Sequence, residues 1–596
     1  MADPRLQSFL GVECSVLGRR WIRRESSERV IQALYQQAGV PELIARVMAA
    51  RGVTPEGAEH FLNPTLREFL PDPSHLLDMD KASTRLARAV MEGETIAVFG
   101  DYDVDGATAT ALLKQFFEAA GGVAILYIPD RIAEGYGPNP AAMRHLKAEG
   151  ASVVVAVDCG TTAFEALDVA AEEGLDLVVV DHHRAEPRLP RAVAVVNPNR
   201  LDEQSPCGHM AAVGVAFLVA VAVNRSLREA GWYGGVGPER MPDTMRWLDL
   251  VALGTVCDMV PLTGVNRALV SQGLKVMAQR GNVGLTALLD LVGTQEKPEA
   301  WHLGFVLGPR VNAGGRVGRA DLGARLLSTS DALEAATLAR SLDSFNVERQ
   351  EIEAAVLLAA MEQLESHSDG GRTLLFASGE GWHPGVVGIV AGRLKDRYNR
   401  PVCVAGIDEG GIAKGSGRSV PGVDLGSAIL AARQAGLLIS GGGHAMAAGF
   451  TVRVERLAEF QTFLTDRIDA VSTGDTTPGL SLDGAVDAGA VCFELVEALR
   501  RLGPYGAGNP EPRFVVANAR VIRADVVGMG HVRCILAGGG GGRLKAIAFR
   551  CVDSALGHAL LNAPGTSVHL AGTLRADTWR GRMEAQMIVE DLAPAS

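Results

Sequence analysis

The fold is decided by the stretch Thr95-Ile96-Ala97-Val98-Phe99-Gly100-Asp101-Tyr102-Asp103-Val104-Asp105-Gly106 and by the small-residue segment 107–120 that follows it. An apolar run that stops at alternating aspartates and then resumes with helical spacing predicts a buried parallel strand, a tight turn and a helix. Three carboxylates packed this closely repel one another, which favours a bound cation. The competing interpretation is a strand end at which one aspartate caps the helix and the other two are solvated.

The composition is that of an ordinary globular protein. The chain has 596 residues, of which 47% are hydrophobic and 21% charged, so it is too long for one core. It contains no uninterrupted apolar span of membrane length, and the start, Met1–Arg5, lacks a signal-peptide pattern, so we expect a cytoplasmic protein. Its eight cysteines are scattered without a CxxC motif, which disfavours a disulfide framework or a cysteine zinc site.

The charge distribution restricts where nucleic acid could bind. A formal net charge of -12 argues against indiscriminate binding of nucleic acid over the whole surface. Residues 500–550 reverse this sign locally, with nine Lys or Arg against Glu511 and Asp525. A local basic excess of this kind is what a phosphate backbone requires.

The pattern along the chain predicts several domains. Strand-like and helix-like segments alternate in the second region, which predicts a doubly wound parallel sheet, and short strands in the last region predict a small closed β-barrel. A long helix without internal Gly or Pro is expected near 330–367, after a glycine-rich loop at Arg310–Arg319. The expected divisions are a helical N-terminal segment at 1–70, α/β regions at 71–265 and 368–471, connecting elements at 266–367, and the barrel at 472–596.

Further segments of the first α/β region end in residues that can bind metal. Two strand-like runs end at Asp158 and at the triplet Asp181-His182-His183, and an apolar segment ends at Asp258. Because the carboxyl ends of parallel strands share one edge, these groups should converge with Asp103 and Asp105. Oxygen and nitrogen ligands without thiolate favour Mn²⁺ or Mg²⁺, and a pair of such ions activates water for phosphoester hydrolysis.

With these motifs the sequence resembles the DHH phosphoesterase superfamily and, within it, the RecJ family of bacterial single-strand-specific 5′ exonucleases. The resemblance covers nearly the whole chain. It rests on Gly100–Gly106, Pro129–Arg131, Glu134–Gly137, Val157–Gly160, the DHH triplet, Gly254–Pro261, Gly441–Ala445 and Gly503–Pro510. It implies a doubly wound parallel-sheet DHH domain, a long connecting helix, a second α/β DHH-associated domain and a C-terminal OB-type β-barrel.

The resemblance also implies a set of catalytic residues. Two Mn²⁺ or Mg²⁺ ions would be held by Asp103, Asp105, Asp158, His182 and Asp258. Asp158 would bridge them, and Asp101 would be an additional ligand or a neighbouring group. His183 would contact phosphate or donate a proton to the leaving oxygen, because imidazole can supply a proton near neutral pH.

Five further residues are implied as substrate contacts. Arg131 would face the substrate phosphate, with a surface ion pair as the alternative. Arg316 would contact the DNA backbone or form a structural ion pair. Ser416 and Arg418 would form a pocket for a 5′-phosphate, where a guanidinium binds two oxygens at once. His444 would support the substrate or occupy a simple turn.

The activity that the resemblance implies is a 5′-to-3′ exonuclease specific for single-stranded DNA, which releases 5′ mononucleotides by two-metal-ion hydrolysis in DNA repair and recombination. Single-strand-binding protein and a RecQ-type helicase are the implied protein partners of a monomer. Two alternatives remain open. A DHH phosphatase on short oligonucleotides or cyclic dinucleotides would lack the barrel expected at 475–596, and a non-catalytic Cdc45-like DNA-binding scaffold would lack metal ligands that this chain retains.

Overall fold

The structure is a computed structural model that describes residues 8–130, 134–135, 137–294, 296–366, 373–471, 477–579 and 582–595. The chain forms two compact units. The first comprises Met1–Tyr127, Gly137–Leu307 and Thr477–Ser596, and the second comprises Ile128–Tyr136 and Gly308–Thr476. Within the described ranges, the helices are all too short or too polar to cross a membrane.

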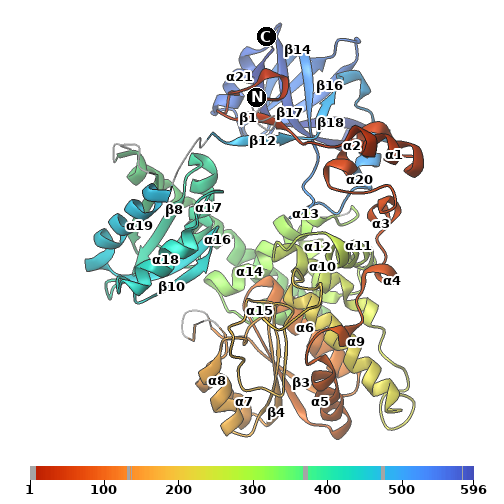
Figure 1. Cartoon of the computed structure of the whole chain (residues 1–596), viewed down its shortest axis with the longest axis vertical. Helices are drawn as coiled ribbons and strands as arrows, with labels where there is room; N and C mark the ends of the chain where they lie inside the picture. The colour runs from red at the N-terminus through yellow and green to blue at the C-terminus, as the bar shows by residue number, and fades with distance from the viewer. Residues whose placement is uncertain are drawn as a thin grey trace. The chain divides into compact units, whose positions relative to one another are not determined.

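The first unit contains the predicted doubly wound sheet. All of its strands are parallel, in the order β3-β2-β4-β5-β6: β2 (Thr95–Gly100), β3 (Val123–Tyr127), β4 (Ala151–Val157), β5 (Asp176–Val180) and β6 (Ala194–Val196). One face is covered by α5 (Met79–Glu92), α6 (Val104–Ala119) and α9 (Ala212–Glu229), and the other by α7 (Pro140–Ala148) and α8 (Phe164–Glu172), as Figure 1 shows. The predicted fold class is therefore confirmed.

The strand order creates a switch point between β2 and β4. The chain leaves β2 toward β3 on one side and then returns to place β4 on the other side. Ligands of open α/β sheets bind outside the carboxyl ends of the strands at such a point. The aspartates that follow β2 and β4 lie there. The sheet is followed by α10 (Leu248–Cys257), α11 (Gly264–Met277), α12 (Val283–Leu291), α13 (Ala300–His302) and a π-helix at Leu303–Leu307.

The second unit begins with helices and continues as a mixed sheet. Its helices are α14 (Gly308–Val317), α15 (Leu322–Ser328), α16 (Ala332–Ser366), α17 (Val387–Tyr398), α18 (Leu425–Gln434) and α19 (Leu457–Val471). The strand order is β10-β11-β9-β8-β7, with β7 (Leu375–Glu380) parallel to β8 (Val402–Ile407). The remaining strands, β9 (Ile412–Arg418), β10 (Ser440–His444) and β11 (Ala447–Arg453), are antiparallel. The long connecting helix is confirmed as α16.

Two predictions about glycine-rich segments in this unit were wrong. The segment Arg310–Arg319 was expected to be a loop, but most of it forms α14. A Cβ on Gly314 would lie 3.2 Å from Leu342 Cδ2 of α16, so this glycine permits close packing of two helices. A simple turn was one expectation for His444 in the segment Gly441–Ala445, but residues up to His444 form strand β10, and the turn comes after it, at Ala445 and Met446.

The C-terminal part of the first unit is a closed barrel. Its strands are β14 (Arg513–Val527), β15 (His531–Ala537), β16 (Arg543–Ala548), β17 (Ser567–Trp579) and β18 (Arg582–Pro594). They pair in the order β14-β15-β16-β18-β17, and β17 also pairs with β14, which closes the barrel. Strand β13 (Gly484–Val486) pairs in parallel with β14. The helices of this part of the unit include α20 (Phe493–Arg500) and α21 (Ala555–Asn562).

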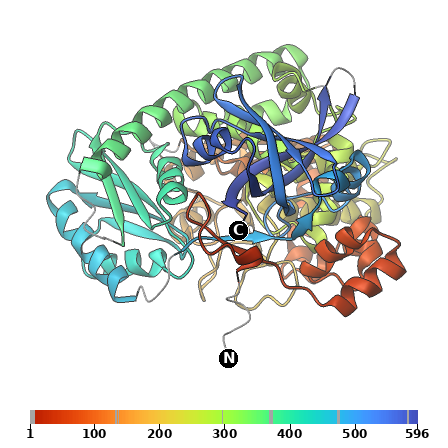
Figure 2. The same cartoon turned by 90° about the horizontal axis from the view of Figure 1, so that it is seen from above.

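The N-terminal segment contains more than the predicted helices. It forms α1 (Glu28–Ala38), α2 (Glu42–Ala50), α3 (Ala58–Leu62) and α4 (Leu66–Phe69). The basic cluster, however, contains strand β1 (Arg20–Arg23), which pairs in parallel with β12 (Gly479–Leu482) beside the barrel (Figure 2). Trp21 is fully buried, and its indole N–H donates to Asp591 Oδ2 at 3.1 Å. Because successive side chains of a strand point to opposite faces, Trp21 can be buried although it lies within an arginine-rich segment.

Candidate metal centre

The aspartates after β2 are held by the first turn of α6. Asp103 is the N-cap, and its Oδ1 accepts the N–H of Gly106 at 3.0 Å. The competing interpretation was therefore right that one aspartate caps the helix. It was wrong that the other two are solvated, because Asp101 and Asp105 are only 5% and 1% exposed. A Cβ on Gly106 would lie 2.6 Å from the carbonyl oxygen of Asp101, which explains the glycine at this turn.

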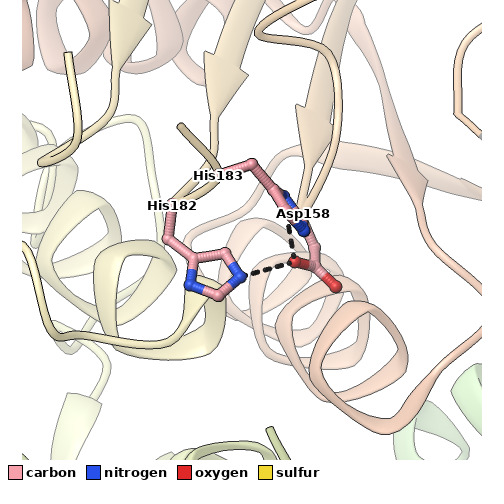
Figure 3. Close-up of side chains that lie close together, drawn as sticks. All are labelled: Asp158, His182 and His183. Atoms are coloured by element: carbon pink, nitrogen blue, oxygen red, sulfur yellow. Dashed lines mark ion pairs between the residues drawn. The ribbon is translucent and has the colours of Figure 1, made fainter. Parts of the chain in front are cut away.

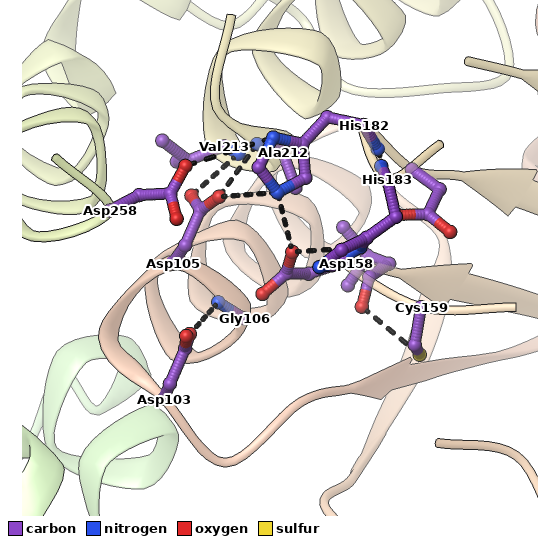
Figure 4. A network of polar contacts seen from close by, with 12 residues as sticks. Asp103, Asp105, Gly106, Asp158, Cys159, His182, His183, Ala212, Val213 and Asp258 are labelled. Atoms are coloured by element: carbon purple, nitrogen blue, oxygen red, sulfur yellow. Dashed lines mark hydrogen bonds and ion pairs between the residues drawn. The ribbon is translucent and has the colours of Figure 1, made fainter. Parts of the chain in front are cut away.

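The carboxylate of Asp105 is fixed by a second helix. Its two oxygens accept the N–H groups of Ala212 at 2.7 Å and Val213 at 2.9 Å, at the N-terminus of α9 (Figure 4). A helix N-terminus favours negative charge. Helix α10 also passes close to this group, because a Cβ on Gly254 would lie 2.9 Å from Asp105 Oδ1. The sequence analysis gave no role to these backbone donors.

Asp158 lies where β4 ends and faces both histidines. Its Oδ1 is 3.3 Å from His182 Nε2 and 4.0 Å from His183 Nδ1 (Figure 3). The residue has a φ of 61° and is 2% exposed. A left-handed conformation at a residue other than glycine is strained, and such strain clusters at functional sites.

His182 presents one ring nitrogen to the aspartates. Its Nδ1 lies 3.2 Å from the carbonyl oxygen of Met210, which can only accept, so Nδ1 carries the proton. The Nε2 lone pair then faces Asp158 and also Asp105, whose Oδ2 is 3.9 Å away. This arrangement of a carbonyl behind the imidazole is the usual support of a metal-binding histidine.

Asp258 completes the cluster from a helix rather than from a strand end. It is the C-cap of α10, and its Oδ2 lies 3.7 Å from His182 Nδ1. Asp258 was expected at a strand end like Asp158, but it follows a helix instead. An apolar run that is buried all round cannot be assigned to helix or strand by periodicity. Asp258 Oδ2 is buried and accepts no hydrogen bond from the part of the chain that the structure describes.

His183 is anchored by the first residue of the triplet. Asp181 Oδ1 lies 2.7 Å from His183 Nδ1 and also accepts the backbone N–H groups of both histidines, and Oδ2 accepts that of Thr161. Burial alone would raise the pKa of Asp181, but the hydrogen bonds from His183 and Thr161 hold it well below its usual range. Burial would likewise lower the pKa of His183, but Asp181 raises it to about 9. The imidazole is therefore protonated near neutral pH.

Two asparagines after β6 support the same pair. Asn197 Nδ2 donates to the carbonyl oxygen of His183 at 2.8 Å, and Asn199 Nδ2 donates to that of His182 at 2.5 Å. Neither asparagine was predicted from the sequence, and the role of Asp181 was not predicted either. The signal available was the Asn197-Pro198-Asn199 segment at the end of an expected strand.

The electrostatics of the cluster favour a cation. Burial, and then the charge of Asp258, raises the pKa of Asp105 to about 7. Burial, and then the charge of Asp103, raises the pKa of Asp258 to about 7 and that of Asp158 well above its usual value. Positive charge at the centre would reverse each of these effects. Carboxylates that repel one another in a buried place therefore fit bound metal better than an ion-free site.

The structure brings all of the predicted metal ligands together, with Asp101 beside them. Ligand atoms within 4.8 Å of one another form three sets: Asp101, Asp103 and Asp158; Asp105, His182 and Asp258; and Asp158, His182 and His183. Asp158 is common to the first and third sets, and His182 is common to the second and third. The donors are carboxylate oxygens and imidazole nitrogens, which suit Mn²⁺ or Mg²⁺.

Three predicted substrate contacts lie together in the second unit. Arg418 Nη1 donates to Ser416 Oγ at 2.7 Å, and a Cβ on Gly388 in the first turn of α17 would lie 3.1 Å from both Ser416 Oγ and Arg418 Nη2. Arg316 Nη1 donates to the carbonyl oxygen of Gly385 at 2.9 Å, just before α17. A guanidinium, a hydroxyl and a helix N-terminus together form a suitable anion site.

His444, a further predicted contact, stands apart from this group. His444 is exposed at the end of β10, and the register places it opposite Ala447, which in turn lies opposite Arg418. It is therefore about 10 Å from Arg418 across two strand spacings. Arg131 lies outside the residues that the structure describes.

Comparisons with known proteins agree with this architecture. Three family models match: the DHH family, N-terminal domain, at residues 95–255, the DHHA1 domain at 371–470 and the RecJ OB domain at 482–591. The single-stranded-DNA-specific exonuclease RecJ of Dickeya dadantii is 37% identical over 93% of this chain and 96% of its own length. That of Escherichia coli is 36% identical over 94% and 96%.

A solved structure matches over a similar range. The crystal structure of RecJ in complex with Mn²⁺ from Thermus thermophilus aligns with a TM-score of 0.79 at 29% identity, over 96% of this chain and 79% of that one. The parallel sheet, with its aspartates and histidine pair and the DHHA1 domain that follows, defines a protein of the DHH family. The barrel and the nearly full-length relatives go further: the chain belongs to the RecJ family.

Proposed function

We propose that this chain is a metal-dependent exonuclease that degrades single-stranded DNA from its 5′ end, releases 5′ mononucleotides and acts in DNA repair and recombination. The observation that carries the proposal is the buried carboxylate–histidine cluster in which two sets of ligand atoms share Asp158. Relatives more than 35% identical over more than 90% of the chain are named single-stranded-DNA-specific exonucleases. The RecJ of Thermus thermophilus, which matches in structure, holds Mn²⁺.

The metal ions would be two Mn²⁺ or Mg²⁺. The residues that would hold them are Asp103, Asp105, Asp158, His182 and Asp258, with Asp158 as the residue that both would share and Asp101 as an additional ligand or a neighbouring group; all six lie in the cluster. Such a pair supplies an activated water and neutralises charge at the phosphoryl group that is attacked. The N-terminus of α9 orients the Asp105 carboxylate, and the carbonyl of Met210 keeps the His182 ring oriented, so the ligands are positioned before the substrate arrives.

We propose that His183 donates a proton to the leaving oxygen. Against the effect of burial, Asp181 raises the pKa of His183, which favours the protonated imidazole, and it fixes the ring through Nδ1. The 3′ oxygen of the departing nucleotide gains negative charge as the phosphodiester breaks and needs a proton. A positioned imidazolium supplies one. Almost half of the His183 side chain is exposed, at 45%, so substrate can reach it.

We assign the terminal phosphate to the second unit. Arg418, Ser416 and the N-terminus of α17 form an anion site, and Arg316 supports the backbone just before that helix. A site that recognises a terminal phosphate accounts for degradation from the 5′ end. His444, in the same sheet, would contact the strand beyond it, and Arg131 would contact a substrate phosphate.

The barrel would hold the single strand. Arg501, Arg520, Arg543 and Arg550 are exposed and form no ion pair with any described residue. Phe549 is 55% exposed and can stack on a base, whereas Phe514 is core and Tyr505 is mostly buried. Other cations of this region are already paired with carboxylates, as Arg533 is with Asp525. Family resemblance alone supports the further proposals of a monomer that works with single-strand-binding protein and a RecQ-type helicase.

The proposal is tested with labelled DNA. Single-stranded and duplex oligonucleotides carrying a label at the 5′ or the 3′ end are incubated with MnCl₂ and the wild-type chain, Asp158→Ala or Asp168→Ala. We expect 5′-labelled mononucleotide to appear first, from single strands only, with the wild type and with Asp168→Ala. Asp168 is a suitable control because it is a surface aspartate of α8, outside the cluster. Intact DNA that remains bound would refute catalysis and favour the scaffold.

A further inference from the structure

The loop that follows Asp258 is held by a segment almost 250 residues further along the chain. The N–H of Leu262 donates to the carbonyl oxygen of Ala507 at 2.7 Å. A Cβ on Gly506 would lie 2.7 Å from Leu262 Cδ1, and one on Gly508 would lie 3.0 Å from Pro261 Cβ. The glycines of the segment Gly503–Pro510, here called the barrel-leading loop, therefore let it lie directly against residues 261–263.

Asn266 on α11 joins this loop to the backbone behind His182. Its side-chain amide donates to the carbonyl oxygens of Pro261 at 3.0 Å and His209 at 2.7 Å. His209 directly precedes Met210, whose carbonyl orients the His182 ring. Asn266 is fully buried. The Asn266 amide therefore fixes both the loop that follows Asp258 and the backbone segment that supports His182.

Arg267, the next residue, holds the barrel-leading loop. Its guanidinium donates to the carbonyl oxygens of Leu502 at 3.0 Å and Gly503 at 2.6 Å, and it also donates to that of Phe61. The side chain is 3% exposed and forms no ion pair with the described residues. Burying a cation without a negatively charged partner costs free energy. Hydrogen bonds to well-placed carbonyl oxygens are what offset that cost for Arg267.

The same loop is tied to the start of the barrel. Asn509 Nδ2 donates to the carbonyl oxygens of Leu502 and Pro504, both at 2.9 Å, and its Oδ1 accepts from Arg51 Nε. Arg51 also pairs with Asp483 at 3.1 Å. Asp483 Oδ2 in turn accepts the backbone N–H of Arg513, the first residue of β14. Hydrogen bonds and the backbone of the barrel-leading loop therefore connect β14 to the loop that follows Asp258.

We infer that Asn266 and Arg267 are positioning residues that tie the placement of the barrel to the geometry of the metal centre. Asn266 fixes the two loops that flank His182, and Arg267 seats the barrel-leading loop that contacts residues 261 and 262. Neither residue touches a metal or the DNA. The inference rests on the proposed metal-dependent function, and it adds that ligand geometry depends on a contact made by the nucleic-acid-binding barrel.

The test compares variants of the full chain with a control on the same helix. Asn266→Leu keeps the size and removes both donors, and Asn266→Ser is a milder change that admits water. Gln272→Leu is the matched control, because Gln272 also lies on α11 and donates to a backbone carbonyl, that of Pro64 at 2.9 Å, away from the metal centre. Mn²⁺ binding is measured by calorimetry with MnCl₂ alone, and kcat and KM are measured on a 5′-phosphorylated single strand.

We expect both Asn266 variants to bind Mn²⁺ about 10–100-fold more weakly, as is typical when a group that supports a metal ligand is lost. High MnCl₂ should restore kcat, while KM for DNA should stay within about twofold. Gln272→Leu should lower thermal stability without changing the Mn²⁺ affinity. Equal Mn²⁺ affinity in the wild type and in a folded Asn266 variant overturns the inference. A wild type that binds Mn²⁺ but leaves DNA intact refutes only the proposed function, because the binding comparison still stands.

Discussion

Replacing Gly254 by alanine should weaken metal binding although Gly254 is no ligand. A Cβ at this position would lie 2.3 Å from Thr108 Oγ1, 2.7 Å from Val213 Cγ1 and 2.9 Å from Asp105 Oδ1. Ordinary contact begins near 3.4 Å, so the Asp105 carboxylate must move by about 0.5 Å. Metal–ligand distances tolerate only about 0.2 Å.

The magnitude follows from two effects. Overpacking a filled core costs about 1–3 kcal/mol, because α6 and α9 must both move away from α10. Displacing one ligand should raise the Kd for Mn²⁺ by about 10–100-fold, which corresponds to about 1.4–2.8 kcal/mol. Calorimetric titration with MnCl₂ gives the second quantity, and thermal unfolding without metal reports the first.

A second overpacked glycine separates the two effects. Gly557 lies in α21, in the barrel part of the same unit, and a Cβ there would lie 1.9 Å from the carbonyl oxygen of Cys551. Gly557→Ala should lower the unfolding temperature but leave the Mn²⁺ affinity unchanged. If Gly254→Ala also binds Mn²⁺ like the wild type, the reasoning that places Asp105 in the metal centre is refuted.

Three further outcomes are expected. Arg418→Met should slow degradation of 5′-phosphorylated strands about 10–100-fold and affect 5′-hydroxyl strands little, because charge-assisted hydrogen bonds to phosphate are worth about 1.5–3 kcal/mol. Burial raises the pKa of Asp249 from 3.8 to about 7, so the folded state loses stability as pH rises through this range. Asp249→Asn should then be more stable than the wild type by up to about 4 kcal/mol at pH 8, with a smaller difference at pH 5. Trp21→Ala should destabilise the first unit by about 3–5 kcal/mol, measured by denaturant unfolding.

The first two of these outcomes have a matched control. Lys414→Met removes a cation from the same strand as Arg418, and it should slow phosphorylated and hydroxyl substrates equally or not at all. Asp168→Asn replaces an exposed carboxylate, so its effect on stability should not vary between pH 5 and pH 8. If Asp249→Asn is no more stable than the wild type at pH 8, burial is not what governs the titration of Asp249.

The sequence predicted the first sheet well because its signal is local. Apolar runs end at Gly100, Val157 and Val180, and the parallel register brings these three ends to one edge. The ligand residues follow directly from those ends. Asp258 was harder to place, since a helix buried all round has the same composition as a buried strand.

Features that depend on distant partners could not be predicted. Nothing near Gly314 shows that the glycine faces Leu342 of another helix, so a helix was taken for a loop. Nothing near Trp21 shows that Asp591 accepts its indole N–H. The same holds for Asn266, whose partners His209 and Pro261 are backbone carbonyls without any sequence signature.

The pairing of β1 with β12 has a consequence for synthesis of the chain on the ribosome. Trp21 and Asp591 are 570 residues apart, so at about 5–20 residues per second their contact cannot form until roughly 30–110 s after Trp21 is made. During that interval the Trp21 indole lacks its hydrogen-bond partner, and β1 lacks its neighbouring strand until β12 has been made, which makes this segment a typical target for chaperones and a risk for aggregation. The wait is set by translation speed, so slower translation should prolong the vulnerable period, whereas in the finished protein Trp21 is fully buried.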